Sequence, residues 1–198
     1  MELQTIIFMG RSGCGKGTQV TLLKDYIKQN DSESREIFSL ETGAKFREMI
    51  EGDSFTSKLA KEIYSNGDLQ PAFLAIHIWS HILIENLKEN NHIILDGTPR
   101  TYSESVILDS VMGFYGRVKP IVVHLNVSRN WSKERLVGRA RFDDTEEGVE
   151  KRLNWFDNEV VPAMNHLRDS GIYNFIEING EQTIEEVHNE LIQKVFNK

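Results

Sequence analysis

The 198-residue chain has a single cysteine and no long apolar run. Its single cysteine, Cys14, excludes an internal disulfide and a cysteine-based zinc site, and favours the reducing cytoplasm as its compartment. No apolar run approaches the ~18 residues of a membrane-spanning helix, and residues 1–11 lack the pattern of a secretory signal. We therefore expect a cytoplasmic protein without a membrane partner.

Positive charge is also scarce, because 23 Lys and Arg residues face 30 Asp and Glu residues and the net charge is −7. A chain of this charge has no general attraction to nucleic acid, so no nucleic-acid partner is expected. Any anionic ligand must be held by a local cluster of cations. The length suggests one domain, 1–198, that is large enough to bury a core without disulfides or a structural metal.

Short apolar runs alternate with helical patterns along the chain. Strands are expected at 5–9, 37–40, 92–96, 120–127 and 173–178. Helices are expected at 16–30, 101–112, 131–141, 145–170 and 183–196, with a kink at Pro162. Strands that are apolar on both faces and alternate with helices predict an α/β protein with a doubly wound, parallel five-stranded sheet.

One stretch interrupts this alternation. Residues 42–90 are helical in pattern throughout, with breaks at Gly52, Gly67 and Pro71. We expect a helical insertion that moves as a unit. Ligands of doubly wound sheets bind outside the carboxyl ends of the strands, where Asp96 and the glycine-rich sequence after the first strand both fall.

That glycine-rich sequence, Gly10-Arg-Ser-Gly-Cys-Gly-Lys-Gly-Thr18, joins the first expected strand to the first expected helix. Glycines let successive backbone N–H groups turn toward a phosphate, and the helix N-terminus adds partial positive charge. Lys16 supplies a full charge for the outer phosphates of ATP. Gly17 stands where the general motif has a Ser or Thr that binds magnesium, so Thr18 becomes the candidate neighbour of Mg²⁺.

Gly10 to Gln19 resembles the phosphate-binding loop of adenylate kinases and related nucleoside monophosphate kinases. Other segments are similar to further motifs of this family: Thr42-Gly43 with Arg47 to T-G-x-x-x-R, 95–101 to D-G-F-P-R-T, 135–152 to the lid, and Asn179-Gly180 to the final adenine-side loop. These motifs follow the family's order from residue 10 to about 180. The chain is identified as a member of this P-loop family, of the type with a very short lid at 138–145.

The resemblance implies reversible, in-line transfer of the γ-phosphate of MgATP to AMP, giving two ADP. It implies catalytic roles for Lys16, Arg100, Arg139, Arg141 and Arg152. It assigns ATP to Gly13, Cys14, Gly15, Lys16, Gly17, Thr18, Arg135, Arg139 and Gly180. It assigns the monophosphate to Thr42, Gly43, Arg47, Leu69, Gly97, Arg100, Glu104, Arg141 and Arg152. No direct protein ligand to Mg²⁺ is expected, and two mobile flaps leave little surface for a partner, so we expect a monomer.

For three aspartates the sequence allows either a functional or a purely structural role. Asp96 orients magnesium through water, or it only forms a turn before Gly97. Asp143 and Asp144 brace the lid arginines, or they cap the following helix, with Thr145 as the alternative cap.

Glu104 stands where the family's P-R-T-x-x-Q pattern has a glutamine that reads adenine. A carboxylate only accepts hydrogen bonds, so it suits the N–H groups of guanine or cytosine and faces adenine N1 poorly unless it is protonated. AMP remains the leading acceptor, with GMP, dGMP or CMP as the alternative. Glu104 could also point to solvent, with the base read by backbone atoms and Thr42.

Two other classes remain open, namely a different small-molecule kinase on the same fold and a non-catalytic nucleotide sensor. The acceptor motifs oppose the first, and the presence of Lys16 and the lid arginines opposes the second. We expect the tryptophans at 79, 131 and 155 to serve packing rather than base stacking.

Overall fold

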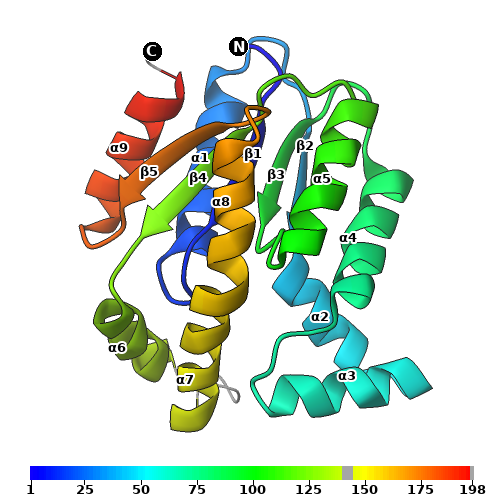
Figure 1. Ribbon diagram of the computed structural model, residues 1–198. Coiled ribbons are helices and arrows are strands. Elements are labelled where there is room, and N and C mark those ends of the chain that lie inside the picture. Colours follow the sequence, from blue (N-terminus) through cyan, green and yellow to red (C-terminus); the bar gives the residue numbers. More distant parts are fainter. Residues whose placement is uncertain (140–144, 197–198) are drawn as a thin grey trace.

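The computed structural model describes residues 1–139 and 145–196. Within these ranges, five parallel strands form one sheet in the order β2-β3-β1-β4-β5 (Figure 1). The strands are β1 (Thr5–Met9), β2 (Ile37–Glu41), β3 (His92–Asp96), β4 (Ile121–Asn126) and β5 (Asn174–Asn179). The predicted α/β class and parallel sheet are confirmed, and each strand lies close to its predicted bounds.

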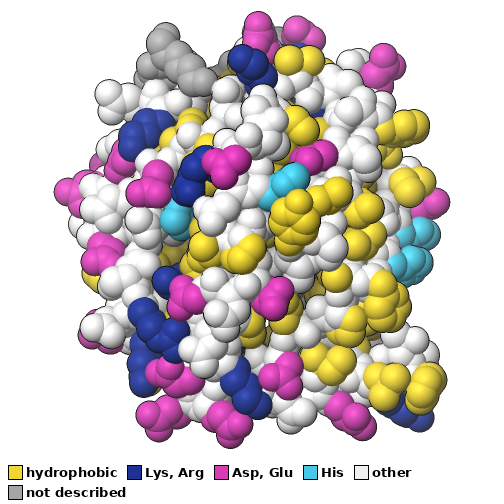
Figure 2. Space-filling view, in the orientation of Figure 1, with side chains coloured by type: hydrophobic (Ala, Val, Ile, Leu, Met, Phe, Trp, Pro, Cys, Tyr) yellow, Lys and Arg dark blue, Asp and Glu magenta, His cyan; other side chains and the backbone are white. Residues whose placement is uncertain are grey.

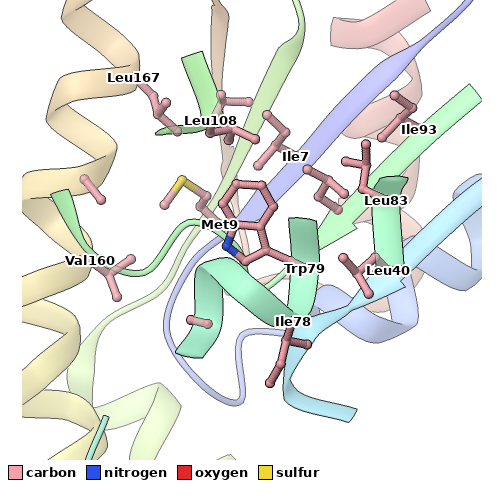
Figure 3. Packing of buried hydrophobic residues seen from close by; sticks show 14 of the residues in the cluster. Ile7, Met9, Leu40, Ile78, Trp79, Leu83, Ile93, Leu108, Val160 and Leu167 are labelled. Atoms are coloured by element: carbon pink, nitrogen blue, oxygen red, sulfur yellow. The ribbon is translucent and has the colours of Figure 1, made fainter. Parts of the chain in front are cut away.

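The central strand β1 is buried on both faces, and its side chains alternate between two cores. Ile6 and Phe8 pack with α1 (Lys16–Asn30) and α9 (Ile184–Phe196). Ile7 and Met9 pack on the other face, under α4 (Ala72–Asn86), α5 (Tyr102–Phe114) and α8 (Val161–Asp169) (Figures 1 and 3). Helices on both faces leave the ends of the strands as the approach for a ligand.

Three helices, α2 (Thr42–Ile50), α3 (Phe55–Ser65) and α4, fill the chain between β2 and β3. The breaks predicted at Gly52, Gly67 and Pro71 fall between these helices. Ser54 caps α3 by accepting a hydrogen bond from the backbone N–H of Ser57 at 3.0 Å. Figure 1 shows α2 and α3 beyond the carboxyl ends of the strands.

Two helices, α6 (Arg129–Arg139) and α7 (Glu146–Trp155), lie at the same end of the sheet (Figure 1). Thr145 is the N-cap of α7, since its Oγ1 accepts a hydrogen bond from the Gly148 N–H at 3.1 Å. Asp143 and Asp144 lie outside the described residues. Leu136, Val149 and Leu153 form a small apolar cluster that joins α6 to α7.

The chain is helical over 146–169, as predicted for 145–170, but the irregularity is not a kink at Pro162 itself. A wider π-helical turn, Phe156–Val160, separates α7 from α8. The Val161 N–H bonds to the Phe156 carbonyl, and Pro162, which has no N–H, follows at once. The irregularity therefore lies just ahead of the proline. In addition, α6 starts at Arg129, two residues before its predicted start at Trp131, and α5 extends to Phe114.

The surface differs between the two sides of the molecule. Hydrophobic side chains, among them Phe73, Ile84 and Phe114, are exposed over α4 and α5, whereas charged pairs such as Arg129–Glu150 gather on α6 and α7 (Figure 2). In the part of the chain that the structure describes, no helix is long and apolar enough to cross a bilayer.

Candidate active site

The glycine-rich loop between β1 and α1 has a backbone that only glycine accepts readily. Gly10 has φ +145° and Gly13 has φ +83°. A Cβ at Gly10 would lie 2.6 Å from the carbonyl oxygen of Leu125, so this position excludes a side chain. Lys16 Nζ donates to the carbonyl oxygens of Gly10 at 2.8 Å and Arg11 at 3.1 Å. The loop therefore holds its own lysine in place.

Two residues predicted to bind ATP, Cys14 within the loop and Gly180 after β5, lie where the loop packs against the sheet. Cys14 is buried in the core, with its Sγ 3.6 Å from Lys16 Nζ. A Cβ at Gly180 would meet Val127 Cγ1 at 2.6 Å and the Cys14 carbonyl oxygen at 3.6 Å. Both residues let the loop pack closely onto the sheet.

The loop opens onto a cleft at the carboxyl ends of the strands. On the donor side it is lined by Ser12, Gly13, Gly15, Lys16, Gly17, Thr18, Arg135 and Gly138. On the other side it is lined by Glu41, Gly43, Arg47, Asp96, Gly97 and Arg100. One cleft thus brings together residues from both predicted nucleotide sites. Arg135 stacks on the Trp131 ring at 4.5 Å.

Asp96 ends β3 beside the loop, because β3 pairs with β1 and the register sets Asp96 against Phe8. Its residue exposure is 8%, and no hydrogen bond among the described residues engages its carboxylate. Burial raises the pKa of this carboxyl, Lys16 lowers it, and Glu41 raises it further. A buried carboxylate beside a lysine, without a hydrogen bond, can serve an incoming cation.

Two arginines form the far wall of the cleft. Arg100 Nε donates to the Gly97 carbonyl at 2.9 Å, and burial lowers the pKa of this guanidinium. Arg47 Nη2 lies 2.8 Å from Glu41 Oε1. Burial lowers the Arg47 pKa, but hydrogen bonds to Glu41 and Tyr64 raise it, and the net shift is upward. Both guanidiniums are held in place by neighbouring groups.

A second cavity adjoins this wall. It shares Ser12, Gly43, Arg47 and Arg100 with the cleft and is further lined by Phe46, Tyr64, Gly67, Asp68, Gln70, Arg152 and Trp155. Sequence reasoning missed Glu41, Tyr64 and Trp155 as site residues. For Trp155 a signal existed, since it lies three residues after Arg152, on one face of a helix.

Trp155 also joins α7 to the connection between α3 and α4. Its Nε1 donates to the Gly67 carbonyl at 3.3 Å, and the Arg100 guanidinium lies 5.7 Å from its ring. Lys151 Nζ donates to the Asn66 carbonyl at 2.9 Å. A Cβ at Gly67 would lie 2.9 Å from Gly148 Cα. The lid-side helix and the insertion are in direct contact.

Glu104 is 1% exposed, so the interpretation in which it points to solvent is wrong. Its Oε1 accepts from Thr101 Oγ1 at 3.2 Å, whereas its buried Oε2 has no hydrogen-bond partner. Burial raises the Glu104 pKa, while Arg100 lowers it. Glu104 lies near Arg100 and does not line either cavity. The Trp79 indole lies near Glu104 and packs among Met9 and other core side chains (Figure 3).

Other predicted residues are placed less directly. Thr42 is buried, with Oγ1 2.5 Å from Thr98 Oγ1. Leu69 lies between Asp68 and Gln70 but does not itself line the cavity. Arg141 lies outside the described residues, as do the side chain of Arg139 and most of the predicted lid at 138–145.

A parallel sheet whose first strand leads into a lysine-bearing glycine loop, with arginines facing that loop, defines a P-loop phosphotransferase. The family model described as adenylate kinase matches residues 8–172. The chain is 30% identical over 197 residues to an adenylate kinase of Leptospira biflexa, covering 98% of this chain and 100% of that one. It is 30% identical over 190 residues to an adenylate kinase of Prochlorococcus marinus strain MIT 9515, covering 96% and 97% of the two chains.

An adenylate kinase of Azobacteroides pseudotrichonymphae is likewise 30% identical over 192 residues, covering 95% of each chain. The chain therefore belongs to the adenylate kinase family, as its motifs predicted. Membership makes it a phosphotransferase with nucleoside monophosphate kinase activity.

Proposed function

We propose that this protein transfers the γ-phosphate of ATP directly to AMP, giving two molecules of ADP in a reversible reaction. One observation carries the proposal, namely the single cleft with the glycine-rich loop on one side and Arg47 and Arg100 on the other. Phosphoryl transfer asks a protein mainly to position two phosphates and to stabilise their charge. A cleft shared by both sets of cations is suited to that task.

On the donor side, the backbone N–H groups of residues 13–18 would surround the ATP phosphates. Lys16 would leave the carbonyls of its own loop for the outer phosphates. Arg135 would cover the donor base, and Arg139 would hold the donor phosphates. Arg141 and Arg152 would bridge toward the group in transfer, because guanidinium forks match phosphate oxygens.

On the acceptor side, Arg47 and Arg100 would hold the monophosphate. Thr42, Gly43, Leu69 and Gly97 would surround the rest of the nucleotide. The bare Cα of Gly43 favours this arrangement, because a Cβ there would lie 3.3 Å from Arg100 Nη2 and 3.5 Å from Arg47 Nη1. A larger residue would obstruct the space between the two guanidiniums.

Mg²⁺ would enter with ATP, with the Thr18 hydroxyl and the Asp96 carboxylate as the nearest oxygen groups, reached through water. These residues fit the ion, because Asp96 is a hard oxygen ligand with no hydrogen bond in the described structure. When bound, the ion neutralises charge on the transferring phosphates. Within the described ranges, no group of three or more His, Cys, Asp or Glu side chains could hold a metal ion without the nucleotide.

We further propose that residues 42–90 and the short lid at 138–145 close over the two nucleotides. Closure would exclude water, which otherwise would hydrolyse ATP in the site. We also propose that the protein acts as a cytoplasmic monomer.

AMP as the acceptor is supported by the names of the relatives and by the surroundings of Glu104. Burial raises the Glu104 pKa and so favours the protonated acid. A protonated carboxyl donates through its O–H and accepts through its carbonyl, as a glutamine side chain does. In that form it would match N1 and the amino group of adenine.

A second candidate, GMP, dGMP or CMP, is favoured by the unpaired Oε2 of Glu104. An ionised carboxylate there would accept hydrogen bonds from the N–H groups of guanine or cytosine. Glu104→Gln separates the two candidates. If AMP is the acceptor, the variant keeps its AMP activity and binds AMP as well or better; if a base with N–H groups is the acceptor, its kcat/KM falls about tenfold. If the variant and the wild type prefer the same acceptor base to the same degree, Glu104 does not take part in base recognition.

The primary test is ADP production from MgATP with AMP, GMP, dGMP, CMP, UMP and dTMP supplied singly. Fast turnover with AMP supports the proposal. Preference for another base would change the proposed acceptor but not the proposed reaction, which is phosphoryl transfer from ATP to a nucleoside monophosphate. ATP binding without transfer to any monophosphate would contradict the kinase activity and favour a sensor. A bisubstrate dinucleotide analogue gives an independent check, because only a protein with both sites binds it far more tightly than ATP.

A further inference from the structure

Glu41 is the last residue of β2, and it places a carboxylate inside the cleft that would receive phosphates. Its Oε1 lies 2.8 Å from Nη2 of Arg47. The register of β2 and β3 sets Glu41 directly beside Asp96. No role for Glu41 was predicted, yet its carboxylate pairs with Arg47 in this structure, where Tyr64 also bonds to the guanidinium.

This pairing competes with the role proposed for Arg47. Arg100 Nη2, Arg47 Nη1 and Glu41 Oε1 lie 3.3, 3.5 and 3.9 Å from the position that a Cβ on Gly43 would take. Two guanidiniums and one carboxylate thus converge on the same small space. A phosphate that approaches both arginines there would meet the Glu41 carboxylate at the face it needs.

The Glu41–Arg47 pair is also weak enough to exchange. The two side chains are 50% and 32% exposed, and ion pairs with such access to water contribute little stability. A phosphate dianion carries more charge than a carboxylate and can engage two guanidiniums through several oxygens. The exchange therefore favours the phosphate when it arrives attached to a nucleoside that makes further contacts.

We infer that Glu41 is a resident carboxylate that pairs with Arg47 until the phosphate of the acceptor nucleotide displaces it. This inference rests on the proposed function, because it takes Arg47 as the ligand of the acceptor phosphate. Because Glu41 competes for Arg47, small anions such as inorganic phosphate should bind to Arg47 only weakly. Displacement also turns Glu41 away from Arg47 while it remains beside Asp96, at the edge where the phosphates meet.

The test compares Glu41→Gln with the wild type by calorimetric binding of AMP, GMP, CMP and inorganic phosphate, without ATP or magnesium. The neutral amide leaves Arg47 accessible, so the monophosphate that binds should bind about two- to fivefold more tightly, and inorganic phosphate should gain by a similar factor. Adenosine, guanosine and cytidine carry no phosphate, and their affinities should stay unchanged.

Two variants control for charge alone. Glu36→Gln removes one carboxylate from the residue directly before β2, where Glu36 pairs with Lys88, and it should bind monophosphates as the wild type does. Glu41→Asp keeps the charge but shortens the side chain, so it should bind monophosphates more tightly than the wild type. Equal affinity in Glu41→Asp and the wild type would indicate through-space repulsion and would overturn displacement.

Weaker or unchanged monophosphate binding in Glu41→Gln would also overturn the inference, because Glu41 would then position Arg47 rather than block it. If monophosphates bind with the expected gain but are not phosphorylated, the proposed function fails and the inference stands. If neither a monophosphate nor inorganic phosphate binds to any form, no anion competes for Arg47, and the inference fails with it.

Discussion

The donor and acceptor sides of the cleft are built in different ways. The donor loop is made of backbone, with glycines at positive φ and a lysine bonded to the loop's own carbonyls. The acceptor side is made of side chains from α2, the segment after β3, and α7, held by ion pairs and ring contacts. The shape of the donor loop depends on chain conformation within nine residues, whereas the shape of the acceptor side depends on how elements distant in sequence pack together.

The difference has a consequence for what each side tolerates. A backbone site keeps its shape when most nearby side chains change, because glycine conformation and the helix N-terminus define it. A side-chain site changes whenever a supporting group changes, because each guanidinium has a partner that sets its position. Substitutions on the acceptor side should therefore alter acceptor binding while leaving ATP binding intact.

The largest effect is expected for Lys16→Ala on the donor side. Removing this charge should lower kcat about 10²- to 10³-fold, because no other group replaces a preorganised cation beside the transferring phosphate. Lys28→Ala, in the last turn of the same helix, should keep near wild-type turnover. Steady-state ADP production measures both. A loss of less than tenfold in Lys16→Ala would show that the loop acts without its lysine.

The next effect is expected for Arg100→Lys on the acceptor side. The variant keeps a charge but loses the planar fork, so kcat/KM for the monophosphate should fall about 10- to 100-fold, with the KM for ATP unchanged. Arg117→Lys is the matched control, because Arg117 also has a burial-lowered pKa and bonds to carbonyls, those of Asn91 and Glu89, away from the cleft. Equal losses for both nucleotides would contradict separate donor and acceptor sides.

A smaller effect is expected for Gly67→Ala, at the contact between α7 and the insertion. Gly67 and Gly171 both have φ +72°, but a Cβ at Gly67 would meet Gly148 whereas one at Gly171 has open space. Gly171→Ala should lose about 1 kcal/mol from the backbone alone. Gly67→Ala should lose about 1–3 kcal/mol more and should raise the acceptor KM. Denaturant unfolding measures the loss of stability, and steady-state kinetics measures the acceptor KM. Equal stability of the two variants would show that the close contact between Gly67 and Gly148 does not limit the side chain at position 67.

The smallest effect is expected in the pH dependence of stability at Glu104. Burial raises the pKa of Glu104 in the folded protein above the ordinary 4.5. At pH values between the unfolded-state pKa and the folded-state pKa, the folded protein therefore holds a proton that the unfolded chain has lost. Stability from this group therefore falls as pH rises through that window. Glu104→Gln should raise Tm at pH 7, and its advantage should shrink toward pH 4.5.

Glu36→Gln is the control of opposite sign. The hydrogen bond from Lys88 lowers the Glu36 pKa, so its contribution is present at neutral pH and is lost as pH falls. Removing that carboxylate should not stabilise the protein at pH 7. If Glu104→Gln lowers Tm at pH 7, the buried carboxylate is a stabilising group and the pKa direction is wrong.

The donor side could be predicted from sequence because its signals are local. Glycines and Lys16 lie between an apolar run and a helical pattern, and strand pairing then places Asp96 beside them. The same locality explains why the strands lie close to their predicted bounds. Thr145 was predicted as the alternative to Asp143 and Asp144 as the cap of α7, and its Oγ1 accepts the hydrogen bond from the Gly148 N–H at the start of that helix.

On the acceptor side, the cleft-lining residues Gly43, Arg47, Gly97 and Arg100 were predicted, but the groups that hold the arginines in place were not. The burial of Glu104 depends on α4 and Trp79, which cover it from another part of the chain. The π-helical turn at Phe156–Val160 depends on packing against the sheet, where Phe156 and Val160 are buried, and Pro162 alone predicted only a kink. The Glu41–Arg47 pair could have been found from the carboxylate directly before Thr42-Gly43.

The positions of the three tryptophans have an optical consequence. Trp131 lies under Arg135 on the donor side, Trp155 faces Arg100 and Gly67 on the acceptor side, and Trp79 is 1% exposed in the core. Indole emission changes when a neighbouring charge moves or water enters. Variants that keep one tryptophan and carry Phe at the other two would thus give separate fluorescence signals for donor arrival, acceptor arrival and loss of the fold.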